Sequence, residues 1–145
     1  MASPEQESGD AEASPASSPA VTPVDLFAFG SRKGPRPLRF GREGKIDLEP
    51  DAEGMVGPEE PPLPAGASTF ADPHQTTLTG HYHRLPKGTV LPAGLGVIAD
   101  GPEDHPESVN QPTHYTIYPT RRMSKEEFND FFLGLPWVYT DNKKT

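Results

Sequence analysis

The sequence predicts an α+β domain built mainly on antiparallel sheet, with one clear helix near its C-terminus. Three observations lead to this fold class. From residue 24 onward, short apolar or alternating segments are separated by turns rich in Gly and Pro. One segment, residues 124–137, carries a full set of helix signals. With 145 residues and a mean hydropathy of −0.65, the chain has enough apolar material for one modest core.

The first 23 residues are predicted to be a disordered acidic tail. They hold Glu5, Glu7, Asp10 and Glu12, many Ser, Ala and Pro, and no Lys, Arg or aromatic residue. Such a segment buries too little apolar area to offset its ordering entropy. It lacks the basic start and apolar run of a secretory signal, and no stretch of the sequence reads as a membrane span. We therefore expect a cytoplasmic location, with delivery by a non-classical secretion route left open.

The expected domain covers residues 24–140 and is followed by a C-terminal tail at 141–145. Three strands are predicted in its first part, at Val24–Phe29, Pro37–Phe40 and Lys45–Leu48. Residues 49–66 then form a Pro-rich acidic segment without a strand pattern. A segment of this length inside a small domain indicates a lid, an insertion or a linker.

Short elements separated by turns fill the next part of the chain. They are predicted at Ser68–Phe70, Gly80–Leu85, Thr89–Leu91 and Leu95–Ala99. Pro86–Gly88 and Pro92–Gly94 have the composition of tight turns. Residues 100–112 form another loop, which contains Pro and His.

Residues 113–120 alternate between polar and apolar side chains, which predicts a strand. His114, Thr116 and Tyr118 would share one face of that strand. Tyr115 and Ile117 would point the other way, toward a core. A strand that carries polar side chains on one face can supply one wall of a binding site.

The helix signal follows directly. Ser124 and Glu127 have the spacing of a capping box, in which each side chain bonds to the other residue's backbone N–H. Met123 precedes the cap at the position of a hydrophobic staple. One apolar stripe at helical spacing consists of Phe128, Phe131, Phe132 and Leu135. Gly134 and Pro136 are expected to end the helix.

The charge balance argues against a dedicated nucleic-acid binder. The formal net charge is −8, and about −4 remains when the acidic tail is set aside. One basic cluster is formed by Arg32, Lys33, Arg36, Arg39, Arg42 and Lys45. It is open to two interpretations: a solvated loop with its cations in water, or a cradle for phosphates. The sequence contains no Cys, which excludes disulfides and thiol catalysis.

Two short motifs match the sequence patterns of known binding sites but lack the structural context that such sites need. Gly94–Ala99 has the pattern G-x-G-x-x-A, but Asp100–Pro102 is a turn, so no helix N-terminus follows to bind a pyrophosphate. His81 and His83 share one face of a predicted strand and could both ligate zinc. Their spacing permits a metal site without defining one. Ordinary exposed histidines are the favoured interpretation, and no metal is assigned.

Four blocks of the sequence, in the same order, resemble one protein family. They are Gly66–Phe70, Tyr82–Leu95, Thr113–Thr120 and Met123–Trp137. The family is that of ADP-ribosyltransferase-like toxins typified by a small effector of bacterial type VI secretion, with relatives in fungi. The resemblance covers residues 66–137. Its most specific part is the run His-Tyr-Thr-Ile-x-Pro, followed by the methionine and the helix.

The resemblance implies a compact fold of two facing, mainly antiparallel sheets with an NAD cleft between them. Ser68 and Thr69 match the family's Ser/Thr pair, which would steady the nicotinamide–ribose end of the dinucleotide. His114 matches the family's histidine and is the expected reactive group. The other expected contacts with NAD are a stacking tyrosine and cations near the diphosphate: Tyr115 or Tyr118, Arg84 and Arg32.

The chain departs from the pattern of this class in two places. Its first strand lacks the expected aromatic–Arg pair, because Arg32 is displaced toward the following loop. No predicted strand carries Glu-x-Glu. Glu126 and Glu127 belong to the start of the helix, where a favourable interaction with the helix dipole explains them.

We expect a toxin domain of ADP-ribosyltransferase type that binds NAD and transfers ADP-ribose to an unidentified intracellular target. An antitoxin or inhibitor protein is a second expected partner. No membrane and no dedicated nucleic-acid partner is expected, and the domain is expected to be a monomer. The alternative is a non-enzymatic interaction module that keeps the same fold and binds partners through its acidic tail and the loop at 49–66.

Overall fold

The computed structural model describes residues 20–38, 50–58 and 65–144. The predicted strand at 45–48, most of the acidic tail, and parts of the predicted strand at 37–40 and of the loop at 49–66 lie outside these ranges. Among the described residues, no helix is both long and apolar enough to cross a bilayer. The elements are β1 (Leu26–Ser31), β2 (Gly34–Pro35), β3 (Met55–Val56), β4 (Ala67–Phe70), β5 (Gly80–Leu85), β6 (Leu95–Ala99), β7 (His114–Pro119), β8 (Met123–Ser124), α1 (Lys125–Leu133) and β9 (Val138–Lys143).

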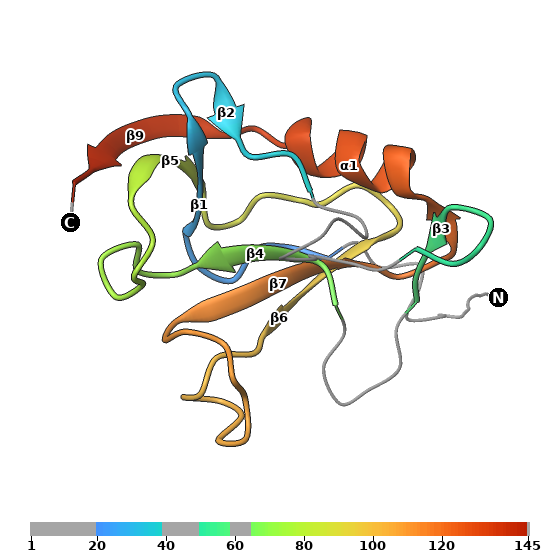
Figure 1. The fold of residues 1–145 in the computed structure, drawn as a ribbon, viewed down its shortest axis with the longest axis horizontal. Coiled ribbons are helices and arrows are strands. Elements are labelled where there is room, and N and C mark those ends of the chain that lie inside the picture. Colours follow the sequence, from blue (N-terminus) through green and yellow to red (C-terminus); the bar gives the residue numbers. More distant parts are fainter. Residues whose placement is uncertain (1–19, 39–49, 59–64, 145) are drawn as a thin grey trace, which may run out of the picture.

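Most strands belong to one antiparallel sheet with the order β6-β7-β4-β1-β5-β9, and β2 pairs with β1. β1 and β4 pair at a single position, where Phe27 lies opposite Phe70. The sheet therefore consists of two parts, β6-β7-β4 and β1-β5-β9 with β2, joined at one point (Figure 1). A mainly antiparallel sheet with one helix confirms the α+β class. The resemblance implied two facing sheets, whereas these two halves share one hydrogen-bonded path.

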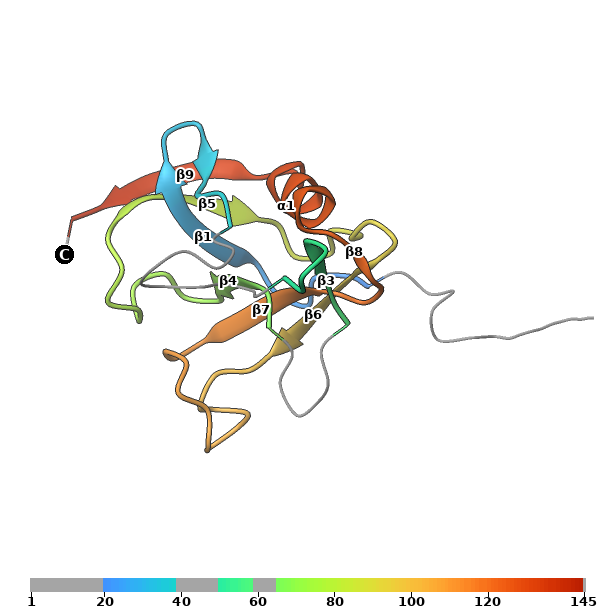
Figure 2. The same cartoon turned by 45° about the vertical axis from the view of Figure 1, so that its right-hand side comes forward.

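The main core lies between α1 and one face of the sheet. In Figure 2 the helix is seen almost end-on, next to β8. The fully buried members of this core come from both halves of the sheet, from β8 and from the helix, and they include Leu26, Leu85, Ile117, Met123 and Phe128. Side chains alternate along β1, so Phe27 and Phe29 point to the opposite face. There they form a second, smaller cluster with Phe70, Tyr82 and Leu78.

The predicted helix is confirmed at its start and along its stripe. The Ser124 hydroxyl accepts the backbone N–H of Glu127 at 3.0 Å, as a capping residue should. The second half of the capping box is not formed, because the Glu127 carboxylate pairs instead with Arg121 at 3.0 Å. Phe128 and Phe132 are buried, whereas Phe131 is only half-buried. The backbone N–H of Gly134 donates to Asp130 and ends the helix.

Several predicted strands are found, and others differ. β5 and β6 have the predicted bounds, while β1 begins two residues later than expected. The segment 89–91 contributes a single bridge, between Val90 and Val21. The expected loop at 49–66 contains β3, which pairs with β8. Residues 141–143, expected to be a tail, form the end of β9 on the outer edge of β5.

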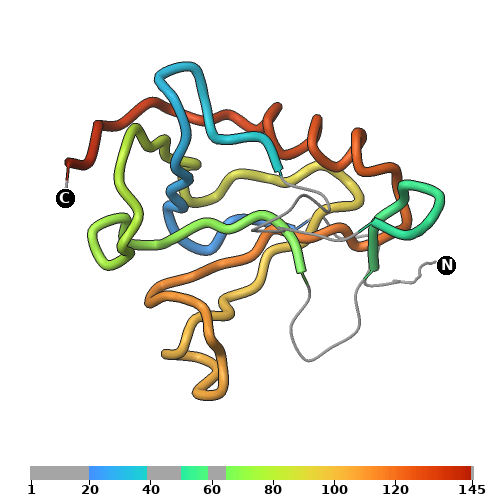
Figure 3. Tube along the Cα trace, viewed as in Figure 1, coloured from blue at the N-terminus to red at the C-terminus, as the bar shows by residue number. Residues whose placement is uncertain are grey.

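The β3 segment is attached to the start of α1 by a charged network. Figure 3 shows this green segment beside the first turn of the orange-red helix. The Asp51 carboxylate accepts the backbone N–H groups of Met55 and Glu53 and pairs with Arg122 at 2.8 Å. The hydrogen bond from Met55, followed by that from Arg122, holds the pKa of Asp51 below its ordinary value.

The lowered pKa of Asp51 predicts a pH-dependent contribution to stability. A carboxyl group whose folded pKa is depressed stabilises the fold above its unfolded pKa, and this contribution is lost as the pH falls through the folded value. Replacing Asp51 by Asn should therefore lower the urea midpoint at pH 7 but have a shrinking effect below about pH 4. Urea unfolding of both proteins across this range checks the prediction. A difference that stays constant down to pH 2.5 would contradict it.

Candidate functional site

An open cleft of about 300 Å³ lies where β1 turns into β2. Its walls come from β1, from the segment that follows it and from the loop before β5: Phe29, Gly30, Ser31, Pro35, Arg36, Pro37, Leu78 and Thr79. A smaller cavity of about 30 Å³ shares Phe29, Pro35, Arg36 and Leu78 with the cleft. This cavity reaches inward to Ser68 and Phe70 on β4 and to Phe132 on the helix. The cleft thus lies beside the joint between the two halves of the sheet.

A tight hairpin positions the entrance of the cleft. At Gly30 an added Cβ would lie 2.3 Å from the carbonyl oxygen of Gly34, so only glycine lets the two strands approach this closely. The backbone N–H of Arg36 then donates to the carbonyl of Phe29 at 3.0 Å. This bond places Arg36 beside Phe29, and the cleft therefore combines a cation with an aromatic ring.

The inner wall of the cleft is aromatic. The ring of Phe29 packs at 5.4 Å from that of Tyr82 and at 6.3 Å from that of Phe70, measured between centroids. Burial raises the pKa of the Tyr82 hydroxyl. Phe70 lies between the cleft and β7, where its ring makes an edge contact with His114 at 5.3 Å. Phe70 is therefore the physical link between the cleft and the histidine.

His114 belongs to a buried polar cluster. Its Nδ1 lies 2.6 Å from the Asp100 carboxylate, and the exposed fractions of the two residues are 6% and 2%. Thr116 donates its hydroxyl to the other carboxylate oxygen of Asp100. With the carboxylate as acceptor, Nδ1 carries a proton, and in the neutral imidazole Nε2 is the nitrogen that can accept one. Among the described residues, none forms a hydrogen bond with Nε2.

The backbone just before His114 is strained. Thr113 has a φ of 62°, in the left-handed region that β-branched residues rarely adopt. This conformation costs on the order of 1–3 kcal/mol, so its surroundings must hold it. The backbone N–H of Thr113 donates to the Glu103 carboxylate at 3.1 Å, and its hydroxyl accepts the N–H of Asp72 at 3.1 Å. The loops that contain Asp72 and Glu103 thus fix the turn that places His114 next to Asp100.

The structure separates the three predicted catalytic residues. Ser68 lies opposite Thr116 on β7 and lines the inner cavity. Thr69 is fully buried, and its hydroxyl donates to the carbonyl of Tyr115 at 3.0 Å. Because neighbouring side chains on a strand point to opposite faces, Thr69 points away from Ser68 and His114. Within the described residues, only Ser68 of the predicted Ser/Thr pair reaches the cavity.

The predicted aromatic and cationic contacts are spread over the domain. Tyr115 is half-buried against the main core, and this burial raises the pKa of its hydroxyl. Tyr118 shares a face with His114 but lies across Gly96, about 13 Å along the strand from the histidine. Of the described residues that line the cleft, none is a tyrosine.

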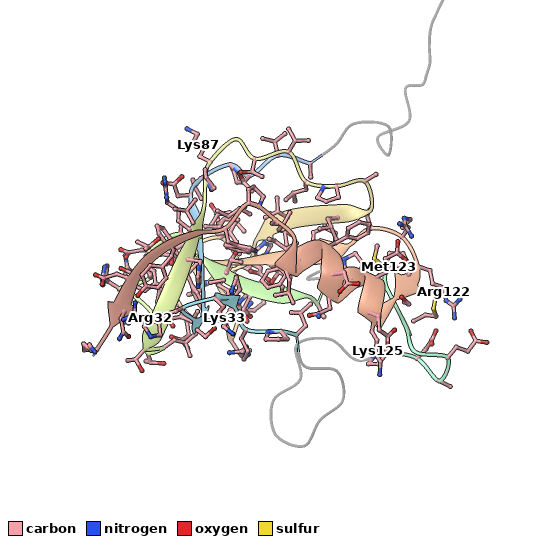
Figure 4. All side chains as sticks on the ribbon, turned by 90° about the horizontal axis from the view of Figure 1, so that it is seen from above. Arg32, Lys33, Lys87, Arg122, Met123 and Lys125 are labelled. Carbon is pink, nitrogen blue, oxygen red and sulfur yellow. The ribbon has the colours of Figure 1, made fainter. Side chains whose placement is uncertain are left out.

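The predicted cations also lie outside the cleft lining. Arg84 pairs with Asp25 at 3.6 Å, and both side chains are well exposed. Arg32 lies in the exposed turn between β1 and β2. Figure 4 shows Arg32 and Lys33 on the side of the molecule away from Arg122 and Lys125. Arg39, Arg42 and Lys45 of the basic cluster lie outside the described residues, and Arg36 is the cluster member that lines the cleft.

Sequence reasoning did not identify Asp100 or Leu78 as members of the site, and it named Arg36 only as one of six cations in a possible phosphate cradle. Asp100 directly follows the apolar strand β6, and a carboxylate in this position is the sequence feature that could have marked it as a site residue. Its pairing with His114, however, depends on the β6–β7 register, in which Ala99 lies opposite Tyr115. Phe29 was recognised only as part of a core strand.

The antiparallel sheet and the helix of the described residues are consistent with a toxin domain of ADP-ribosyltransferase type, the class that a family match shows. A family model described as Tse2 ADP-ribosyltransferase toxin matches residues 24–143. The chain belongs to this Tse2 family, as the sequence resemblance predicted. No curated protein and no solved structure matches the chain.

Proposed function

We propose that this domain binds NAD as its substrate in the cleft at the end of β1 and transfers ADP-ribose to a target inside a cell. The observation that carries the proposal is the meeting of three features at the joint of the sheet. These features are an aromatic wall, a cation and a hydroxyl in one cleft, with a buried His–Asp pair behind them. Family membership supports the same chemistry.

The lining of the cleft fits the parts of NAD. The ring of Phe29 offers a flat apolar surface for the nicotinamide. The guanidinium of Arg36 suits the diphosphate, since a guanidinium can bond two oxygens of one phosphate. Ser31 and Ser68 offer hydroxyls to the ribose. A volume of about 300 Å³ is at the lower end for ligand sites and suits the nicotinamide half of the molecule.

The residues behind the cleft supply proton transfer. In NAD, nicotinamide is bonded to C1 of the ribose. This bond breaks as the acceptor atom of the target bonds to C1, and nicotinamide leaves. His114 Nε2 takes the proton that the acceptor loses, because Asp100 holds the imidazole with its proton on Nδ1. The ring of Phe70 contacts His114 and lines the inner cavity, so this proposal requires Phe70 to move aside and bring Nε2 within hydrogen-bond reach of the acceptor. In this proposal Ser68 orients the ribose, and Thr69 supports the strand from its other face.

The target, an antitoxin or inhibitor protein, a cytoplasmic location and a monomeric state belong to the same proposal. A toxin domain that modifies an intracellular target must be kept inactive in the cell that makes it. A dedicated inhibitor protein would serve this purpose. The competing proposal is a binding module that keeps the fold without using NAD.

Titration of the full chain with NAD tests the proposal. Trp137 is a natural reporter, because its ring packs at 5.3 Å from that of Phe132, which lines the inner cavity. We expect its fluorescence to change on binding and nicotinamide to be released. Binding without nicotinamide release would support the NAD site but contradict the proposed transfer reaction. An unchanged signal at millimolar NAD would favour the binding module.

Replacing Phe29 by Leu should weaken NAD binding by about two- to tenfold, because the aromatic surface is lost while the apolar volume is largely kept. The matched control is Phe27→Leu, on the same face of the same strand and in the same cluster, but outside the cleft lining. Fluorescence titration of both variants gives the comparison. Equal dissociation constants for the two variants would show that NAD does not stack on Phe29.

A further inference from the structure

Lys143, near the end of β9, is an unusual buried cation. Only 9% of the residue is exposed. Its ammonium donates to the carbonyl of Thr76 at 2.5 Å and lies 5.9 Å from the centroid of the Phe29 ring. Within the described ranges it forms no close ion pair, although its charge helps to lower the pKa of the Asp72 carboxyl, after hydrogen bonds from Gln75 and His74. Burying an ammonium without a close ion pair is costly, so the contacts with this carbonyl and this ring help to hold it in place.

The first contact controls the loop that forms one wall of the cleft. Thr76 is itself buried, and its hydroxyl donates to Gln111 at 2.7 Å and accepts the backbone N–H of Leu78 at 3.2 Å. Leu78 lines both the cleft and the inner cavity. The position of Leu78 therefore depends on Thr76, and Thr76 is held by Lys143.

The second contact reaches the wall that comes from β1, and Leu78 also packs against the aromatic cluster of that wall. Phe29 lines the cleft and the cavity from β1, and the ammonium of Lys143 lies over its ring. Lys143 pairs with Gly80 at the start of β5, so the end of β9 is fixed directly beside the loop that carries Leu78 (Figure 1). One ammonium thus connects the two walls between which the ligand is proposed to bind.

We propose that Lys143 is a positioning residue that sets the separation of these two walls and, through it, the affinity of the cleft for NAD. The inference rests on the proposed function for the identity of the ligand. Lys143 does not touch the reacting atoms. It acts through Thr76 and Phe29, and its loss should affect binding more than the chemical step.

The test compares Lys143→Met with Lys144→Met in the full chain. Methionine keeps the apolar length of the side chain but loses the charge and the donor. Lys144 is the exposed neighbour and provides the matched control. We expect Lys143→Met to raise the Kd and the KM for NAD by about tenfold or more, with a smaller change in kcat. Amide hydrogen exchange should accelerate at residues 76–79. Lys144→Met should resemble the parent, and Lys143→Arg should recover part of the affinity.

Parent-like Kd and exchange rates in Lys143→Met would overturn the inference. A lowered melting temperature with an unchanged Kd in the folded protein would also overturn it, because Lys143 would then only stabilise the fold. If the parent itself does not bind NAD, the proposed function fails. The inference about the walls is then decided by amide hydrogen exchange at residues 76–79. Faster exchange in Lys143→Met, but not in Lys144→Met, supports it, and parental exchange rates in both variants reject it.

Discussion

Replacing Phe128 by alanine is expected to lower the free energy of unfolding by about 3–5 kcal/mol, the range for a large aromatic side chain removed from a core. Phe128 is 0% exposed and packs in the main core between α1 and the sheet. The alanine would leave a cavity that the strands on the other side cannot fill. Because small domains have only about 5–15 kcal/mol of stability, this loss is a large share of the total. Urea unfolding monitored by circular dichroism gives the value.

Phe131→Ala provides the matched control. The sequence places Phe131 in the same apolar stripe as Phe128, but the structure leaves it half-buried. Its loss should therefore cost about half as much or less, in proportion to the apolar area that it buries. If the two substitutions cost the same, then the helix is rotated relative to the packing described above.

The fold could be predicted where the signal is local. The helix has its cap, its stripe and its stop within residues 124–136, and β5 and β6 lie between turns, so both kinds of element can be recognised from neighbouring residues. β9 and β3 could not be recognised in this way. Four of the six residues in β9 are exposed, and β3 is two residues long. Both strands exist because a distant strand offers them backbone hydrogen bonds.

The candidate site could be predicted only in part, for a similar reason. Ser68 and His114 were identified from a resemblance, and alternation predicted which face of β7 carries His114. Alternation could not show that the face of β7 with His114 is buried too. The residues that cover it, Asp100 and Phe70, lie on two other segments of the chain. The cleft walls, Phe29 and Leu78, have the composition of ordinary core residues. Their role depends on a cation at the end of β9.

Replacing Asp100 by asparagine is expected to lower NAD turnover by about two to four orders of magnitude and to remove most of the toxicity, while the domain stays folded. The Asp100 carboxylate accepts bonds from His114 Nδ1 and from the Thr116 hydroxyl. An asparagine can keep both contacts by turning its amide N–H₂ toward the histidine. The proton of the imidazole then moves to Nε2, and the nitrogen that should accept a proton becomes a donor. Nicotinamide release and growth inhibition in expressing cells measure the loss.

Asp100→Leu separates this effect on the tautomer from an effect on folding. Leucine removes both acceptors and leaves His114 and Thr116 with unsatisfied buried donors, which should cost about 1–3 kcal/mol for each donor and clearly lower the melting temperature. Asp100→Asn should instead melt close to the parent and still bind NAD, because Asp100 does not line the cleft. Thr116→Val removes one bond to the same carboxylate without changing the tautomer, so it should retain much more turnover than Asp100→Asn. A folded Asp100→Asn protein with parental turnover would mean that His114 does not act as a base, and that the buried pair only holds β6 against β7.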